Sequence, residues 1–177
     1  MKILVLKSSG NVHGNTNTLV DELIRGAREN GHEIEELDLV RSNLNGCTGC
    51  NACGMNGNCV QQDDMTNEFM NKLLTADALV LSSPTYYFNI SAQLKAFIDR
   101  FYSWTSKISS KHMKTAFITT CWNSDDETIS IIRDYINKLN DYMNFESVGE
   151  IYATGCTSLE ITKRMYLDKA YELGEKF

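Results

Sequence analysis

Four cysteines fall within thirteen positions of the sequence, at a spacing that suits joint chemistry. They are Cys47, Cys50, Cys53 and Cys59. Repeated Cys-x2-Cys spacing is typical of iron–sulfur sites, in which thiolates surround an inorganic core. Zinc also accepts four thiolates, although structural zinc sites more often use two separated pairs, and neighbouring thiols can serve as redox-active groups. The spacing therefore indicates a joint metal or redox role and leaves these three kinds of site open.

A second group of polar residues, Ser8 to Thr18, follows the first apolar run of the chain. Small residues there let the backbone approach a ligand closely, and the hydroxyl and amide side chains are hydrogen-bond donors. A helix that starts behind them adds free N–H groups and the positive end of its dipole. The segment suits a terminal phosphate monoester, and an Asn-rich turn that only opens a helix is the alternative. It has neither the glycine spacing of a dinucleotide fingerprint nor the Gly-Lys-Ser/Thr of a Walker loop.

Three consecutive aromatic residues, Tyr86, Tyr87 and Phe88, follow the only proline of the chain, Pro84. A proline fixes one backbone angle and removes a donor, which suits the end of a strand. A planar ring system such as a flavin needs apolar stacking surface and backbone amides directed at its polar edge, and this loop offers both. Each aromatic taken singly fits an ordinary core position. Three of them at the carboxyl end of a strand favour a ligand-binding rim.

The polar segment and the aromatic loop each follow an apolar run that is expected to be a strand. Apolar runs predict five strands in the whole chain. The predicted strands are Ile3–Leu6, Ile34–Leu39, Ala78–Leu81, Ala116–Thr119 and Val148–Ala153, the second at a sheet edge because it mixes apolar residues with Glu and Asp. Apolar residues at helical spacing predict the intervening helices over Leu19–Ala27, Met65–Leu74, Leu94–Phe101 and Ile131–Leu139, with a last helix opened by Thr157 and Glu160. This alternation predicts an α/β fold with a doubly wound parallel sheet. Ligands in such folds bind beyond the carboxyl ends of the strands, so the segments after the first, third and fourth strands are the ones to examine.

Several polar residues are expected to play structural roles. Ser124 and Glu127 form a capping-box pattern, and Asp63-Asp64 is expected to cap the helix that begins near Met65. Asp99-Arg100 is expected to make surface or subunit contacts. The isolated cysteines, Cys121 and Cys156, are expected to fill apolar space.

The composition is that of an ordinary water-soluble domain. The 177 residues contain 42% hydrophobic and 23% charged residues, and the formal charge is −6. Scattered Lys and Arg argue against a nucleic-acid partner or a membrane-surface patch. The apolar run at the start is too short for a signal peptide, and no window approaches the length of a membrane span. We therefore expect a single domain over residues 1–177 with a cysteine-rich loop at 46–60, located in the cytoplasm.

The run Ser83-Pro84-Thr85-Tyr86-Tyr87, continued by Ile90 to Arg100, resembles the NADPH-dependent FMN reductase family. Together with Gly14-Asn15-Thr16 and Gly57 to Met65, it is similar to the iron–sulfur flavoprotein and multimeric flavodoxin branch. The resemblance covers nearly the whole chain and implies a flavodoxin-like fold that binds FMN. Relatives often carry Gly-Ser-Pro-Arg where this chain has Lys7 to Gly10, so the resemblance does not choose between NADH and NADPH.

The resemblance also assigns roles to individual residues. It implies a phosphate site made by Ser8, Ser9, Asn15, Thr16, Asn17 and Thr18. It implies a ring site made by Ser83, Pro84, Thr85, Tyr86, Tyr87 and Phe88, with a third side made by Thr120, Cys121, Trp122 and Asn123. Iron–sulfur flavoproteins hold a [4Fe–4S] cluster on a compact motif like that of Cys47, Cys50, Cys53 and Cys59.

The main functional hypothesis is an oxidoreductase in which NAD(P)H reduces FMN and the flavin passes electrons to a quinone, a flavin or a protein acceptor. No side chain is expected to act as a catalytic acid or base, because the flavin carries the chemistry. One alternative is an electron carrier that uses FMN and a [4Fe–4S] cluster. Another is a redox-sensing module whose cysteines report oxidants. By resemblance we expect a homodimer or homotetramer.

Overall fold

The computed structural model describes residues 1–177, and strands alternate with helices along them. The elements are β1 (Lys2–Lys7), α1 (Asn15–Glu29), β2 (Glu33–Asp38), η1 (Met65–Phe69), α2 (Met70–Thr75), β3 (Ala78–Pro84), α3 (Ala92–Asp99), η2 (Arg100–Trp104), α4 (Thr105–Ser109), β4 (Lys114–Thr120), α5 (Glu127–Met143), β5 (Glu146–Ala153) and α6 (Leu159–Glu175). Of the short elements, η1 is a π-helical turn and η2 a 3₁₀-helix.

The five strands form one parallel sheet in the order β2-β1-β3-β4-β5. The predicted doubly wound sheet is confirmed, and β2 lies at an edge as its mixed composition indicated. Glu35 of this edge strand is paired with Lys2 at 2.8 Å and with Lys72 at 2.9 Å. The strand β2 is added on one side of β1, and β3, β4 and β5 are added on the other side. The strand order therefore reverses at β1, and the crevice between β1 and β3 is the switch point of the flavodoxin-like fold.

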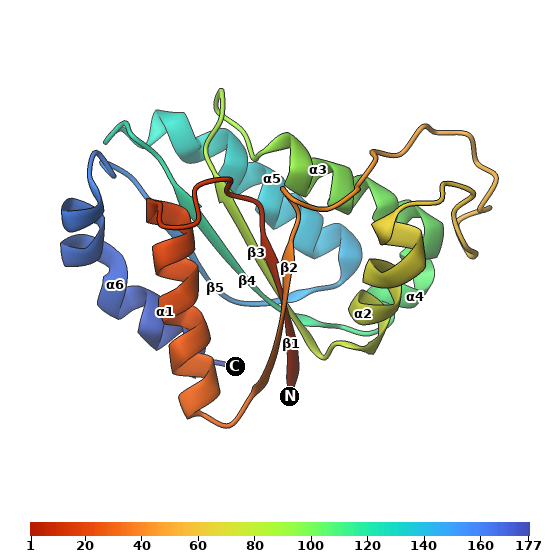
Figure 1. Ribbon diagram of the computed structural model, residues 1–177, viewed down its shortest axis with the longest axis horizontal. Coiled ribbons are helices and arrows are strands. Elements are labelled where there is room, and N and C mark those ends of the chain that lie inside the picture. Colours follow the sequence, from red (N-terminus) through yellow and green to blue (C-terminus); the bar gives the residue numbers. More distant parts are fainter.

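Alternate residues of each strand point to opposite sides of the sheet and build two cores. One core of 17 buried residues lies under α1 and α6 and includes Ile3, Val5 and Val80. The other, of 23 buried residues, lies under α2, α3 and α5 and includes Leu4, Leu6 and Phe117. Figure 1 shows α1 and α6 together on one side of the sheet, with α3 and α5 on the other. None of the helices combines the length and apolarity needed to cross a lipid bilayer.

The contact between α1 and α6 is close because each helix presents a glycine to the other. A Cβ atom added at Gly174 would lie 2.1 Å from the backbone oxygen of Leu23, and one added at Gly26 would lie 2.3 Å from that of Tyr171. Both contacts are with backbone atoms, which cannot move without shifting a helix. Tyr171 also packs under the Arg25 guanidinium, 4.3 Å from the ring centroid. These glycines therefore set the distance between the two helices.

We expect Gly174→Ala to lower the free energy of unfolding by about 1–3 kcal/mol, since overpacking forces the two helices apart. Urea denaturation followed by circular dichroism measures the change. Gly46→Ala is the matched control because a Cβ atom there meets nothing within 4 Å. Equal stability of the two variants would show that α1 and α6 are not held in contact at Gly174.

The helix starts differ from the predictions in detail. The capping box at Ser124 is wrong: α5 begins at Glu127, and Asp125 accepts hydrogen bonds from the Thr128 N–H and hydroxyl at 2.8 and 2.6 Å. The last helix begins one residue later than expected, because the Ser158 hydroxyl accepts the Ile161 N–H at 3.2 Å in place of Thr157. A carboxylate accepts these N–H bonds more strongly than a hydroxyl, which is why Asp125 displaces Ser124.

Candidate flavin site and cysteine loop

A layer of buried hydroxyl side chains lies at the carboxyl ends of β1, β3 and β4. The Ser8 hydroxyl donates to the Ser82 carbonyl at 2.7 Å and accepts from the Ser91 hydroxyl at 2.8 Å. The Ser91 N–H donates to the Ser83 hydroxyl at 2.8 Å. Because these hydroxyls bond one another, they hold the loops in place and leave backbone groups to face a ligand.

The predicted phosphate segment lies between this layer and the start of α1. Thr16 and Thr120 share a hydroxyl hydrogen bond of 2.7 Å, and the Asn15 amide donates to the Cys156 carbonyl at 2.8 Å. The helix is capped by Gly14, whose lack of a side chain leaves its first N–H groups without a side-chain acceptor. Exposed N–H groups at a helix start are suited to an anion.

Asn17, in the first turn of α1, has a buried side-chain atom without a hydrogen-bond partner. Its amide nitrogen donates to the carbonyls of Ser9 and Asn11 at 3.2 and 2.8 Å, while its side-chain oxygen is buried and has no partner. Ser9, whose carbonyl accepts the Asn17 amide, is buried, and Thr18, the next residue of α1, is half-buried. A buried amide oxygen without a partner is an acceptor, so it fits a ligand that brings a hydrogen-bond donor, such as a hydroxyl group, to this loop.

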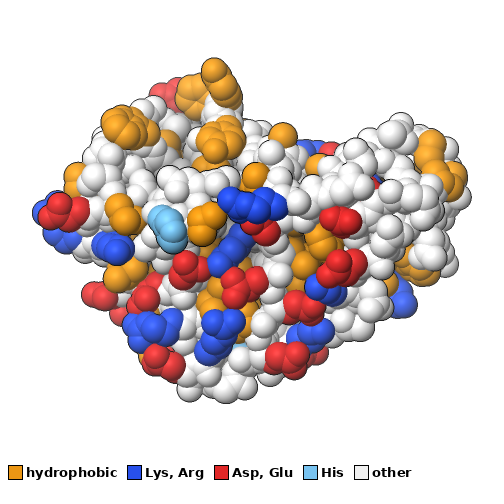
Figure 2. Space-filling model, viewed as in Figure 1, with side chains coloured by type: hydrophobic (Ala, Val, Ile, Leu, Met, Phe, Trp, Pro, Cys, Tyr) orange, Lys and Arg blue, Asp and Glu red, His pale blue; other side chains and the backbone are white.

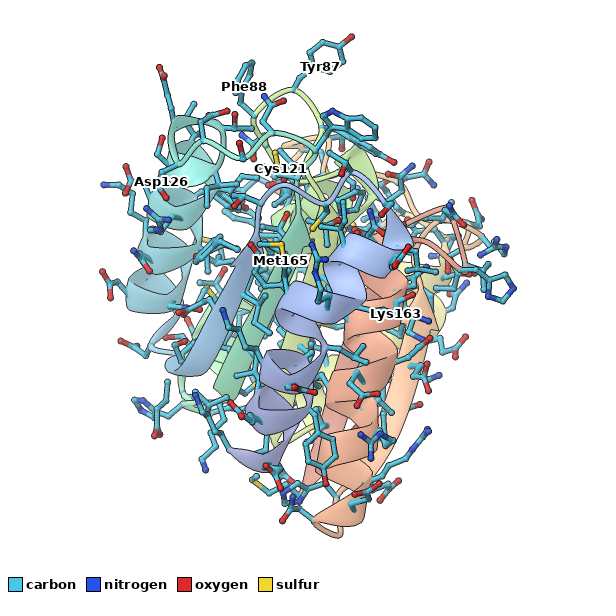
Figure 3. All side chains as sticks on the ribbon, turned by 90° about the vertical axis from the view of Figure 1, so that its left-hand side faces the viewer. Tyr87, Phe88, Cys121, Asp126, Lys163 and Met165 are labelled. Carbon is cyan, nitrogen blue, oxygen red and sulfur yellow. The ribbon has the colours of Figure 1, made fainter.

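The aromatic loop after β3 is a tight turn that projects from the sheet. Tyr86 and Asn89 exchange backbone hydrogen bonds of 2.8 and 3.0 Å, and Tyr87 and Phe88 between them have φ of 47° and 65°. Tyr87 is 98% exposed and points away from the body of the molecule (Figure 3). Hydrophobic side chains stand out over this loop at the upper edge of Figure 2. The turn presents apolar surface instead of burying it.

The segment after β4 forms the opposite wall. An open pocket of about 180 Å³ lies between the two loops and is lined by Thr85, Tyr87, Phe88, Cys121, Trp122, Asn123 and Thr128. Trp122 is 70% exposed, whereas Cys121 is buried, and Figure 3 shows Cys121 below Tyr87 and Phe88. Burial raises the pKa of the Cys121 thiol, so this thiol stays protonated. Thr85 connects the loop after β3 to the end of β4, because its N–H donates to the Thr120 carbonyl at 3.0 Å.

The four clustered cysteines lie in the segment between β2 and η1, which contains no helix or strand. Cys47 and Cys50 are exposed, and Cys53 and Cys59 are half-buried. No three of them, with or without His, Asp or Glu, are gathered as a metal-binding group in this structure. The donor set is that of an iron–sulfur site, but the sulfurs are not brought together. Hydrogen bonds from the Ala52 backbone and the Thr48 side chain lower the pKa of Cys50.

Arg100 corrects one of the sequence expectations, through its contact with Asp63. Arg100 does not lie at the surface: it is 2% exposed and forms an ion pair with the buried Asp63, with nitrogen–oxygen distances of 2.6 and 3.1 Å. Burial opposes the charge of Asp63, but the Arg100 guanidinium and the Asn45 and Thr66 N–H groups hold the pKa of its carboxyl below the usual range. Asp63 does accept the Thr66 N–H at the start of η1, as expected of a cap, at 3.2 Å.

A comparison with known protein families identifies the family of this chain. The sequence model of the NADPH-dependent FMN reductase family matches residues 1–155. The chain belongs to this family. It is therefore an FMN-dependent oxidoreductase, and the expected family and fold are confirmed.

Two relatives within the family are named iron-sulfur flavoproteins. One, from Archaeoglobus fulgidus, is 30% identical over 99% of this chain and 78% of its own length. The other, from Methanocaldococcus jannaschii, is 40% identical over 56% of this chain and 51% of its own length. Among solved structures, the NAD(P)H:quinone oxidoreductase from Methanothermobacter marburgensis superposes with a TM-score of 0.78 at 17% identity, over 98% of this chain and 93% of that one. This last likeness shows the shared fold.

Proposed function

We propose that the protein accepts electrons from NADH or NADPH on bound FMN and passes them to a quinone, a free flavin or a protein acceptor. The observation that carries this proposal is the convergence of three loops, after β1, β3 and β4, at one edge of the sheet beside its switch point. Each loop offers what one part of FMN requires. When bound, FMN supplies the hydride acceptor and releases electrons to the next partner.

The loop after β1 is the proposed phosphate site. The free N–H groups at the start of α1 would hold the phosphate, within a loop made by Ser8, Ser9, Asn15, Thr16, Asn17 and Thr18. The buried hydroxyl bonds of Ser8 and Thr16 hold this loop against β3 and β4. We infer that these two side chains position the loop, and that the helix N–H groups make the direct contacts.

The loops after β3 and β4 are the proposed ring site. Ser83, Pro84, Thr85, Tyr86, Tyr87 and Phe88 would border one side of the ring system, and Thr120, Cys121, Trp122 and Asn123 the other. The backbone N–H groups of Tyr87, Phe88 and Trp122 have no acceptor within the chain and are available to the polar edge of the ring. Because the Cys121 thiol stays protonated, this side chain adds no charge to the pocket.

Anaerobic titration of the FMN-loaded protein with NADH and with NADPH tests the proposal. We expect at least one nicotinamide to bleach the flavin absorption at near-stoichiometric amounts. Dithionite is the control that shows the flavin to be reducible. Bleaching by dithionite and by reduced ferredoxin, but by neither nicotinamide, would contradict the reductase proposal and favour an electron carrier.

The electron carrier is the second candidate, and the cysteine loop supports it. Four thiols with repeated Cys-x2-Cys spacing lie on one loop of the chain, and similar proteins are named iron-sulfur flavoproteins. We propose that Cys47, Cys50, Cys53 and Cys59 act together as a [4Fe–4S] site that exchanges electrons with FMN. The loop would have to close around the cluster, since the sulfurs are not gathered in this structure.

We also propose that the protein works as a homodimer or homotetramer. The exposed aromatic rim supports this, because Tyr87, Phe88 and Trp122 present apolar surface that monomers rarely leave uncovered.

A further inference from the structure

The two ends of the cysteine loop are fastened to each other. The Asp64 N–H donates to the Asn43 carbonyl at 3.0 Å, and the Asn43 N–H donates back to the Asp64 carboxylate at 2.8 Å. The Asn45 N–H donates to the Asp63 carboxylate at 3.1 Å. These bonds close a neck, defined here as Asn43–Asn45 with Asp63–Asp64, from which the cysteine-bearing segment projects (Figure 1).

Arg100 lies beneath this neck and bonds both sides of it. One terminal nitrogen, Nη1, donates to the Asn45 carbonyl at 2.8 Å and to Asp63 at 2.6 Å. The other, Nη2, donates to Asp63 at 3.1 Å and to the Thr66 hydroxyl at 2.8 Å. A planar guanidinium can make all four contacts at once, whereas a lysine ammonium cannot match the two oxygens of a carboxylate in this way.

The remaining donor of Arg100, its Nε–H, is buried and has no partner. Arg100 lines a small cavity of about 10 Å³ together with Asn58, Cys59, Thr66 and Ser103. Buried donors without a partner are rare in native proteins and need an explanation. Cys59 also lines this cavity. A thiol is a weak hydrogen-bond acceptor, and its sulfur becomes a stronger one when the thiol ionises or binds a metal.

We propose that Arg100 is the positioning residue of the cysteine site: it clamps the neck through Asp63 and Asn45, and its Nε–H, which has no partner in this structure, becomes the hydrogen-bond donor for the sulfur of Cys59 when the cysteine site forms. The second part rests on the proposed joint role of the cysteines, and the first part does not. The clamp joins the two ends of the segment that carries Cys47 and Cys59. The fit of the site to an iron–sulfur group is thus supported by an unpaired buried donor as well as by the four thiols.

Hydrogen exchange in metal-free protein tests the clamp. In Arg100→Lys we expect the Asn45 and Thr66 amides, which both donate to Asp63, to exchange about 10-fold faster or more, because the carboxylate loses its bidentate partner. Lys95→Met is the matched control, since it removes the exposed Lys95–Asp99 pair on the neighbouring helix α3. Thr66→Val removes a single Arg100 contact and serves if Arg100→Lys does not fold. Unchanged exchange in the folded variants would overturn the clamp.

Anaerobic reconstitution with iron and sulfide tests the donor. We expect Arg100→Lys to retain FMN, to bind less than half of the wild-type iron, and to show a more negative cluster reduction potential, because hydrogen bonds to cluster sulfurs raise that potential. Wild-type iron content and potential in Arg100→Lys would overturn the donor role. Absence of iron from the wild-type protein would instead overturn the proposed cluster, while the exchange experiment still decides the clamp.

Discussion

FMN should bind the flavin-free protein about 100-fold more tightly than riboflavin does, a difference of about 3 kcal/mol in binding free energy. The two ligands differ only in the phosphate. Two hydrogen bonds from the N–H groups at the start of α1 to a charged phosphate, each contributing about 1.5–3 kcal/mol, account for this difference. Gly14 leaves these groups free of a side-chain cap. Isothermal titration calorimetry with both flavins measures the ratio.

A charge placed in the same loop should erase the preference. Ser9→Asp puts a carboxylate in the loop whose backbone accepts the Asn17 amide, where its charge repels phosphate, so we expect FMN affinity to fall to that of riboflavin. Ser106→Asp adds the same charge at an exposed position of α4 and is the matched control. Equal affinity of the wild-type protein for FMN and riboflavin would refute the phosphate site.

Anaerobically prepared protein should contain about four irons and four sulfides per chain, and replacing any one of the loop cysteines with Ser should remove most of both. Three remaining thiolates cannot close the site equally well, so the four single variants should behave alike. FMN content should not change, because the flavin loops lie elsewhere in the sequence. Iron and sulfide analysis and the broad visible absorption beyond the flavin bands measure the loss.

Cys156→Ser is the matched control for these four variants. Cys156 is buried away from the cysteine loop, and its sulfur donates to the Ala153 carbonyl at 3.4 Å, a bond that a serine hydroxyl can also make. The variant should keep its iron. Reconstituted wild-type protein without iron would rule out the cluster and leave a reductase that works with FMN alone.

The strands were predictable because buried parallel strands consist of nearly continuous apolar residues. Ile3–Leu6 lies within β1 and Ala78–Leu81 within β3. The helix starts were less predictable, since Ser124, Asp125 and Asp126 can all cap and tertiary packing selects among them. The π-helical turn at Met65–Phe69 was not predictable, because the buried residues Met65, Phe69 and Leu73 keep the four-residue spacing of an ordinary helix.

The candidate site could be proposed from the sequence where its chemistry is local to one segment. Ser8 to Thr18 and Pro84 to Phe88 carry their donors and aromatic rings in sequence, so each segment could be assigned before its neighbours were known. Arg100 was missed because its partner Asp63 lies 37 residues away. A signal existed, since Arg100 follows Phe97 by three residues and therefore falls on the apolar stripe of its helix.

The turn at Tyr87 and Phe88 has a consequence for engineering. Two-residue hairpins of this kind favour Asn-Gly, because both central residues adopt left-handed backbone angles, and each side chain with a Cβ costs about 1–2 kcal/mol there. Here the two places are filled by large aromatics with φ of 47° and 65°. Thermostabilisation that follows backbone preference alone would select Asn-Gly and strip the aromatic surface from the pocket. The left-handed turn and the proposed ring site therefore share two adjacent residues, and a library for improved thermal tolerance should hold both of them fixed.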